Sequence, residues 1–396
     1  MASAKPKILF VHYSDLDMTG GERMTLRLIE GMSGSQYRPI LLTQRYGPLA
    51  QAVRTGGIET IVLPLPSRLD RYDGGILRYS VLRMCATALD LLSYNIRFAR
   101  IATREGISAV WCSNIRALLT VGVTARILNL PVIWNVWLAR RFGRVTQWLY
   151  DICYLLPTHI VTEYYGQASG LFSPRATAMG GQKVSTVYTG LDPSAFVPPS
   201  PDQCSDIERA SGTWHVVTCC RITPRKNVEC LLEAIAMLNR RGKRVRATVI
   251  GKPFSECDKK YFDGLRRKVA DDATSSLIEF AGWRKDVRAH LAAADLFVST
   301  SLSEGLPGAV REAQAAGLPV VATDAGGTRE AIQDRVSGLL VPCGDANALA
   351  IAIEKVVADP ELCARFGAAG RKHAAEMFSM EAFIRGYASV FCRALR

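Results

Sequence analysis

The chain has 396 residues, more than one compact core comfortably holds, so two domains are the better expectation. Hydrophobic residues make up 48% and charged residues 21%, as in an ordinary globular protein, and no apolar run reaches the roughly eighteen residues of a transmembrane helix. The eleven cysteines show no CxxC or Cys/His metal spacing. With no cleavage site for a signal peptide, we expect a reduced, cytoplasmic protein.

The net charge of +13 is unevenly distributed. Residues 1–190 carry 21 Lys and Arg against 11 Asp and Glu, whereas the remainder carries 28 against 25. This asymmetry indicates that the first half meets something anionic, such as a membrane, a phosphate or a nucleic acid. A solvated basic face is the alternative.

Apolar segments of strand length alternate with helical patterns along the first half. The expected strands are 7–13, 38–44, 59–65, 108–114, 131–137 and 158–163. A second series follows, with expected strands at 214–220, 246–251, 278–282, 295–300 and 319–323 and helices at 226–241, 258–270, 286–293 and 308–317. Such alternation predicts an α/β fold with doubly wound parallel sheets.

The segment 196–212 separates the two series and is rich in Pro, Ser and charge, which is typical of a linker. The predicted organisation is a Rossmann-like domain over 1–195, a linker over 196–212, a second Rossmann-like domain over 213–375, and a C-terminal helix over 376–396. We expect a cleft between the two domains.

The sequence SEGLPGAVRE, directly after the expected strand 295–300, places Glu304 and Glu312 around a Pro-Gly pair. Pro307 suits a first helical turn, so the amides of residues 308–310 are expected to point outward as an anion site. At this edge of a parallel sheet, Glu312 is suited to ribose hydroxyls and Glu304 to the sugar beyond the phosphates. A capped surface helix with two solvated acids is the alternative.

Two cations, Arg221 and Lys226, follow the buried strand 214–220 on a Pro-bearing loop. They are suited to neutralising a diphosphate as it leaves, without a metal ion. Arg225 is a less certain partner, and a solvated charge cluster is the alternative.

The ordered blocks CCRITPRKNVECLLEAI, IEFAGWRKDV, ADLFVSTSLSEGLPGAVREAQAAGLPVVATDAGGTREAI and SGLLVPCGDANALA resemble glycosyltransferase family 4 (group 1), retaining enzymes of the GT-B fold. The resemblance extends to KVSTVYTGLDPSAFVP and GGERMTLRL, so it spans most of the chain.

The resemblance implies a donor site for a nucleotide diphosphate sugar. In it, Arg221 and Lys226 hold the diphosphate, Glu304 and Glu312 hold the sugar and the ribose, Gly308, Ala309 and Val310 line the phosphates, Trp283 and Arg284 lie near the base, and Gly20 and Gly21 approach the donor from the first domain. Arg221, Lys226 and Glu304 are the expected catalytic residues.

The family commonly has a histidine after the strand that corresponds to 131–137, but Trp137 stands there, with Asn135 two positions before it. We therefore assign Asn135 and Trp137 to an altered acceptor or sugar pocket. His12, at the end of the first strand, could approach the cleft, but a structural histidine with satisfied hydrogen bonds is the preferred interpretation. The DLD sequence at 15–17 matches an Asp-x-Asp metal signature, but matches of three letters arise often by chance. No metal or other cofactor is predicted.

Two segments of the first domain, 75–106 and 138–156, combine apolar and aromatic residues with arginines that include Arg140, Arg141 and Arg144. Such segments suit an anionic membrane surface. Helices that pack on the sheet with their arginines extended to water explain the pattern equally well.

Together these features predict a metal-independent, retaining transferase that moves a hexose from a UDP- or GDP-sugar to an acceptor hydroxyl. The preferred acceptor is a lipid-linked or membrane-proximal glycan in polysaccharide biosynthesis, at the inner face of the membrane. A nucleotide-sugar 2-epimerase on the same scaffold is a second candidate. A non-catalytic anion-binding scaffold is a third, and no nucleic-acid recognition module is recognisable.

Overall fold

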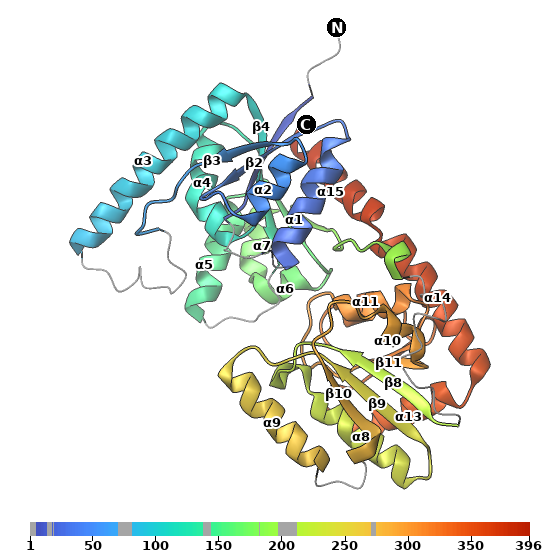
Figure 1. The fold of residues 1–396 in the computed structure, drawn as a ribbon. Helices are drawn as coiled ribbons and strands as arrows, with labels where there is room; N and C mark the ends of the chain where they lie inside the picture. Colours follow the sequence, from blue (N-terminus) through green and yellow to red (C-terminus); the bar gives the residue numbers. More distant parts are fainter. Residues whose placement is uncertain are drawn as a thin grey trace. The chain divides into compact units, whose positions relative to one another are not determined.

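The computed structural model describes residues 5–13, 18, 20–69, 81–137, 144–181, 183–196, 212–270 and 275–396. The chain divides into two compact units (Figure 1). Unit 1 comprises Met1–Glu163, Gln167–Tyr188 and Phe383–Arg396, and unit 2 comprises Tyr164–Gly166 and Thr189–Ala382. Of the predicted linker, 197–211 lies outside the described residues.

Within the described residues, unit 1 has one parallel sheet in the strand order β3-β2-β1-β4-β5-β6-β7. Its strands are β1 (Lys7–Val11), β2 (Arg38–Thr43), β3 (Glu59–Val62), β4 (Ile107–Cys112), β5 (Val132–Val136), β6 (His159–Thr162) and β7 (Val184–Thr186). The central strands are apolar along nearly their whole length because helices cover both faces of the sheet (Figure 1).

The helices of unit 1 connect successive strands, as in a doubly wound fold. They are α1 (Gly20–Ser33), α2 (Pro48–Thr55), α3 (Val81–Glu105), α4 (Ile115–Ile127), α5 (Arg144–Leu155), α6 (Gln167–Leu171) and α7 (Pro174–Gly180). Asn114 caps α4 by accepting a hydrogen bond from the Ala117 amide. The core of the unit is rich in aromatic residues, among them Trp134, Tyr150 and Phe172, whose rings contact one another.

Unit 2 has a parallel sheet in the order β10-β9-β8-β11-β12-β13, again within the described residues. Its strands are β8 (Trp214–Cys219), β9 (Val245–Ile250), β10 (Ile278–Gly282), β11 (Leu296–Ser299), β12 (Val320–Thr323) and β13 (Leu339–Val341). Its helices are α8 (Val228–Arg240), α9 (Glu256–Ala270), α10 (Arg288–Ala293), α11 (Gly308–Ala315), α12 (Thr328–Ala331), α13 (Ala346–Val357) and α14 (Pro360–Phe378), with short 3-10 turns η2 (Pro193–Phe196), η4 (Pro224–Lys226) and η5 (Ser275–Leu277).

The two sheets therefore confirm the predicted pair of doubly wound α/β domains. The sequence did not reveal β7 and β13, because each has three residues, too few to establish an alternating pattern. The helix expected to start at residue 226 begins at Val228, since Lys226 belongs to η4. Likewise, α11 ends at Ala315 rather than at residue 317.

The last helix, α15 (Met380–Ala394), is separated from α14 by Ser379, whose extended backbone interrupts the helical segment. Its buried face consists of Phe383, Tyr387, Val390 and Phe391, spaced as one stripe of a helix. From Phe383 onward this helix belongs to unit 1.

The stripe of α15 packs on the sheet and on α1 of unit 1. The rings of Phe391 and Phe10 lie 5.9 Å apart between centroids. The Tyr37 hydroxyl donates to the Ala388 carbonyl oxygen over 3.2 Å. A Cβ added to Gly31 would come within 2.3 Å of the Ile384 side chain, so a larger residue there would require that side chain to move.

Among the described residues, no helix combines the length and apolar character that a membrane span requires.

Candidate functional site

The carboxyl edge of the unit 2 sheet carries most of the predicted donor-binding residues. Arg221 and Lys226 follow β8, and Glu304 follows β11. These two strands are neighbours, and the strand order reverses between them. Open parallel sheets bind ligands at the carboxyl ends of strands where the order reverses. The topology therefore puts these side chains where a ligand is expected.

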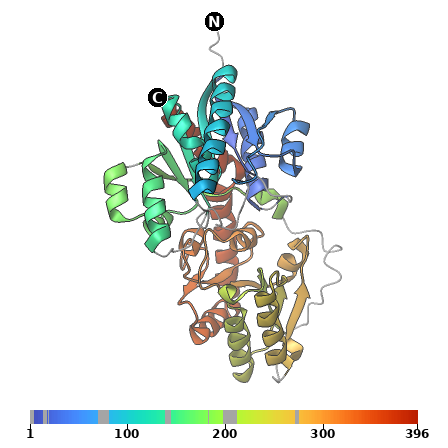
Figure 2. The ribbon, with the colours of Figure 1, turned by 90° about the vertical axis from the view of Figure 1, so that its left-hand side faces the viewer.

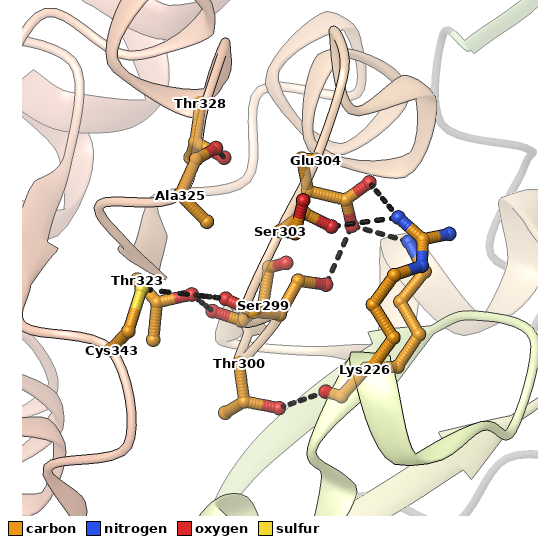
Figure 3. Close-up of polar contacts among 11 residues, drawn as sticks. Lys226, Ser299, Thr300, Ser303, Glu304, Thr323, Ala325, Thr328 and Cys343 are labelled. Carbon is orange, nitrogen blue, oxygen red and sulfur yellow. Dashed lines mark hydrogen bonds and ion pairs between the residues drawn. The ribbon is translucent and has the colours of Figure 1, made fainter. Parts of the chain in front are cut away.

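Lys226 is held beside the loop after β11 by its own backbone. Thr300 Oγ1 donates to the Lys226 carbonyl oxygen over 2.9 Å (Figure 3). The next residue, Asn227, adopts a left-handed conformation with φ of 47°, which asparagine tolerates better than most residues. This turn ends η4 and lets α8 begin directly after it.

Glu304 is a buried carboxylate, with 7% of the residue exposed, and it faces the cations of the loop after β8. Its Oε1 forms an ion pair with Lys226 Nζ and accepts a hydrogen bond of 2.5 Å from Ser301 Oγ. Arg225 Nη1 lies 3.8 Å from Oε2. Figure 3 shows the Lys226 side chain extended toward Glu304. Burial and several partners fix the direction of this carboxylate.

Arg221 does not join this group. Its guanidinium lies 3.4 Å from Asp258 Oδ2 and 4.6 Å from the centre of the Phe254 ring. Hydrogen bonds from the Ser255 backbone, and to a lesser extent the charge of Arg221, lower the pKa of Asp258. The cation next to Glu304 besides Lys226 is thus Arg225, and the predicted role of Arg221 in holding a diphosphate stays a prediction.

Glu312 lies in the second turn of α11 and is half-buried. Burial raises the pKa of Glu312, and the positive charge of Arg311 opposes this shift. The pKa of the Cys219 thiol is raised to about 12, chiefly by burial and further by the charge of Glu312. Since Cys219 ends β8, this electrostatic interaction puts Glu312 near the same sheet edge as Lys226.

The start of α11 is open above its first residue. Pro307 precedes the helix with an extended backbone, and Gly308 is the first helical residue. A Cβ added to Gly308 would meet only the end of the Arg311 side chain, at 4.0 Å. This space is compatible with the predicted backbone contact of Gly308, Ala309 and Val310 with a phosphate, which remains a prediction.

Arg311 is a buried cation that sequence reasoning missed. Its guanidinium donates to the carbonyl and hydroxyl oxygens of Thr189 and lies 5.4 Å from the centre of the Phe378 ring. These contacts fix α11 to residues near the two ends of the long segment of unit 2, Thr189–Ala382. No spacing or composition signal distinguishes this arginine from an exposed helix residue.

The Gly326-Gly327 pair was also given no role from the sequence. Gly326 has a φ of +57°, and a Cβ added to it would come within 2.1 Å of the Glu304 carbonyl oxygen. A Cβ on Gly327 would come within 2.3 Å of the Gly305 carbonyl oxygen. The loop after β12 therefore packs directly on the backbone that carries Glu304, and it does so because both residues lack side chains.

A row of cations and exposed aromatic rings follows the carboxyl ends of β8, β9 and β10. Lys252 Nζ lies 5.3 Å from the Phe254 ring centre and 5.5 Å from that of Trp283. The Arg221 guanidinium also contacts the Phe254 ring. The Trp283 ring thus lies beside a cation, and its predicted place near a base stays a prediction, while sequence reasoning assigned no role to Lys252 and Phe254. Arg284 is exposed, and its charge helps to lower the pKa of His290, which burial lowers first.

The remaining predicted residues lie in unit 1. Gly20 and Gly21 form the start of α1, and their contact with a donor stays a prediction. Asn135 is 2% exposed and accepts a hydrogen bond from the Tyr387 hydroxyl, so it anchors α15. Trp137 follows β5 and is half-buried. The structure gives Asn135 a packing role, and the acceptor pocket stays a prediction.

His12 has partners for both ring nitrogens. Nε2 lies 3.4 Å from Glu22 Oε1, and Nδ1 lies 3.0 Å from Thr25 Oγ1. These contacts tie the end of β1 to α1, which agrees with a structural role for this histidine.

The predicted DLD sequence at 15–17 lies outside the described residues. In the parts of the chain that are described, no group of three or more His, Cys, Asp or Glu residues is arranged to bind a metal ion.

Residues 204–373 match the family described as glycosyl transferases group 1. This part of the chain belongs to the group 1 glycosyltransferases. It contains Lys226, Glu304 and Glu312, together with the glycine pair that supports the Glu304 backbone. Membership of family 4 within this group stays a prediction.

Several curated relatives align over less than half of the chain. They include the lipopolysaccharide core biosynthesis glycosyltransferase LpsE of Rhizobium meliloti, which is 36% identical over 42% of this chain and 46% of the relative. The amylovoran biosynthesis glycosyltransferase AmsK of Erwinia amylovora is 30% identical over 46% of this chain and 44% of the relative. A GDP-mannose-dependent mannosyltransferase of Mycolicibacterium smegmatis is 31% identical over 46% and 49%. The chain thus spans about half the length of these curated relatives.

Solved structures share the fold over the whole chain. Anabaena Alr3699/HepE in complex with UDP has a TM-score of 0.79 at 18% identity and covers 98% of this chain and 100% of its own. A glycosyltransferase from Rickettsia africae has a TM-score of 0.79 at 17% identity, with 100% of both chains covered. The predicted GT-B fold is confirmed by this likeness, which at such identities concerns the fold alone.

Proposed function

We propose that this group 1 glycosyltransferase transfers a hexose from a UDP- or GDP-sugar to an acceptor hydroxyl, with retention of configuration and without a metal ion. The observation that carries the proposal is the Lys226–Glu304 pair at the carboxyl edge of β8 and β11. A cation suited to a diphosphate and an acid suited to a sugar hydroxyl lie in contact there, within a segment of the family match.

In the proposed reaction, the bond between sugar C1 and the diphosphate oxygen breaks, and its electron pair leaves with the diphosphate. Lys226 neutralises the charge that develops on this leaving group. The acceptor oxygen bonds to C1 on the same face, and its proton passes to a donor phosphate oxygen. A donor diphosphate offers Lys226 a second anion, and Glu304 then accepts a hydrogen bond from a sugar hydroxyl.

Names of related proteins support the donor and acceptor classes. Alr3699/HepE has been solved in complex with UDP and with UDP-glucose, and one relative is GDP-mannose-dependent. LpsE is named for lipopolysaccharide core biosynthesis, and the mannosyltransferase is named for a phosphatidylinositol monomannoside. We therefore propose a lipid-linked or membrane-proximal glycan as acceptor, reached at the inner face of an anionic membrane. The ten cysteines within the described residues are all free, as a reducing compartment would keep them.

A two-step experiment tests the proposal. A panel of nucleoside diphosphates is first compared for thermal stabilisation, since a ligand at about 100 times its dissociation constant adds roughly 2.7 kcal/mol. The matching nucleotide sugars are then incubated with glycan acceptors, and the anomeric configuration of the product is read by nuclear magnetic resonance. An α-linked product from an α-linked donor is expected.

Three other results would contradict parts of the proposal. Inversion at C1 removes the retaining mechanism. A change in the donor sugar at C2 without any acceptor identifies an epimerase. Binding of a nucleotide sugar without turnover on any acceptor, together with an unchanged donor, favours a non-catalytic scaffold.

A further inference from the structure

Three neighbouring helices of unit 1 expose apolar side chains at helical spacing. The exposed residues are Leu89, Leu92 and Ile96 on α3, Leu119, Val123 and Ile127 on α4, and Trp148, Leu149, Ile152 and Leu155 on α5. On α3 and α4 they recur every three or four positions, and on α5 Ile152 follows Trp148 by four and Leu149 by three. Each helix therefore presents one apolar stripe to the solvent in addition to the stripe that packs on the sheet. We call these residues the three-helix face.

Contacts within unit 1 bring the three stripes together. Thr124 Oγ1 on α4 donates to Asn95 Oδ1 on α3 over 2.6 Å. A Cβ on Gly122 of α4 would come within 2.9 Å of the side chain of Leu156, which follows α5. In chain colours, α3 runs down the near side of unit 1 in Figure 2. The three-helix face is therefore continuous across α4.

Arginines supply the exposed charge beside the apolar stripes of these helices. Arg97, Arg100 and Arg126 are exposed beside the apolar stripes. The acidic residues on the described parts of the three helices all have partners. Asp90 pairs with Arg68 at 2.7 Å, Glu105 lies 3.9 Å from Lys7 Nζ, and Asp151 accepts from the Ser173 amide at 2.8 Å.

We propose that the three-helix face is the surface by which this protein docks on an anionic lipid membrane. Exposed apolar stripes on neighbouring helices, with an exposed tryptophan and a margin of arginines, match the chemistry of a bilayer interface. A second copy of this chain would bring the same arginines together, and the net charge of +13 adds to that repulsion. The proposal adds a partner surface to the proposed glycosyl transfer. It does not depend on that activity, because its arguments are the exposure and the charge of these helices.

Of the basic residues that the sequence first suggested for a membrane, Arg140 and Arg141 lie outside the described residues, and the side chain of Arg144 does too. The proposal uses none of these three, whereas its Arg97 and Arg100 lie in the segment 75–106.

The first test measures co-sedimentation of the full chain with vesicles, without donor or acceptor. Vesicles of phosphatidylcholine with phosphatidylglycerol are expected to retain the protein at about 0.1 M salt and to release most of it at about 1 M salt, because the Debye length falls from about 10 Å to about 3 Å. Arg97→Glu and Arg100→Glu are each expected to weaken binding by at least about fivefold, the equivalent of roughly 1 kcal/mol per basic residue.

A matched pair of variants separates this face from general surface hydrophobicity. Val123→Glu changes a residue that is 55% exposed on α4, and Ile351→Glu changes one that is 52% exposed on α13 of unit 2. The first variant is expected to lose vesicle binding and the second to keep it. Equal behaviour of the two variants, or no binding by the unmodified protein at low salt, overturns the proposal.

A third measurement reports contact with the bilayer directly. Trp148 is 66% exposed. Lipids brominated in the acyl chain are expected to quench part of the protein fluorescence, and Trp148→Phe is expected to remove that part. If the unmodified protein instead self-associates in solution and Val123→Glu makes it monomeric, the face binds a second copy and the membrane proposal is wrong.

Nucleoside diphosphate binding is measured in parallel by calorimetry. Absence of vesicle binding with intact nucleotide binding counts against the three-helix face alone. Absence of nucleotide binding with intact vesicle binding counts against the proposed glycosyl transfer alone.

Discussion

At the scale of single residues, the Lys226–Glu304 contact combines a structural and a chemical task. The pair is largely buried, so removing Glu304 takes the carboxylate away from Lys226, whereas removing Lys226 leaves Glu304 with Arg225 and Ser301. Any substitution there must therefore be evaluated for stability as well as for rate.

Lys226→Ala is expected to reduce kcat by about 10² to 10³, because the leaving diphosphate loses its nearest cation. Its control is Lys243→Ala, which removes an exposed lysine paired with Glu354 at 3.0 Å in the same unit. Steady-state kinetics and thermal melting of both variants check this. Unchanged kcat in a folded Lys226→Ala protein contradicts the leaving-group role.

Glu304→Ala and Glu312→Ala are expected to differ. Glu304→Ala frees Lys226 and keeps the binding of a bare nucleoside diphosphate, while discrimination among donor sugars declines. Glu312→Ala weakens binding of the bare nucleotide itself, because ribose hydroxyls lose their acceptor. Calorimetry with the nucleotide alone decides, and equal losses in the two variants would refute the division.

Nucleotide affinity is expected to decrease as the pH is lowered, because Glu312 becomes protonated. Its pKa is raised above 4.5 by burial, so the folded protein takes up a proton at a higher pH than the unfolded chain. The stability that this group contributes is thus present at low pH and is lost as pH rises through the raised pKa, whereas ribose binding needs the ionised form.

Comparing the unmodified protein with Glu312→Gln over mildly acidic pH isolates this effect. Both proteins share the titration of the nucleotide phosphate near a pKa of about 6. A steeper loss of affinity on acidification is expected in the unmodified protein only. Parallel pH profiles would mean that Glu312 does not contact the ribose.

At the scale of elements, the loop after β12 supports the loop after β11. Gly326→Ala is expected to destabilise unit 2 and to displace Glu304, since its Cβ would overlap the Glu304 carbonyl oxygen at 2.1 Å. A loss of about 1–3 kcal/mol of unfolding free energy is expected from overpacking and backbone strain.

Gly344→Ala is the matched control for this prediction. Gly344 also has a positive φ, of 77°, but an added Cβ there meets nothing within 4 Å. Denaturant unfolding of both variants separates backbone strain from the overlap with Glu304. Equal destabilisation in the two variants would mean that the overlap contributes nothing.

Sequence reasoning succeeded where the signal is local. Apolar strands buried on both faces, and the charged residues that directly follow them, were predictable because each is a contiguous pattern. The positions of Lys226 and Glu304 at one sheet edge followed from the expected fold. Arg311, Lys252 and Gly326 were missed because their roles depend on contacts with residues such as Thr189 or Trp283, far away in the sequence. The direction of Arg221, toward Asp258, was not predictable for the same reason.

At the scale of the whole molecule, residues from both ends of the chain build the core of unit 1. Phe391→Ala is expected to cost about 3–5 kcal/mol, because it leaves a cavity against Phe10 and Tyr37. Hydrogen exchange is expected to accelerate in β1 and β4, but not in β8. Ser389→Ala, at an exposed position of the same helix, is expected to leave exchange unchanged. Faster exchange confined to unit 2 would contradict this assignment of α15.

This arrangement has a consequence during biosynthesis. A ribosome adds about 5–20 residues per second, so the sheet face around Phe10 is made on the order of tens of seconds before residues 383–396 that cover it. Until then, the nascent chain carries an uncovered apolar surface, whereas the segments of unit 2 are already complete at residue 382. A message that ends prematurely before residue 383 would therefore yield a product with one complete unit and one aggregation-prone unit, which is the kind of species that chaperones and proteases select.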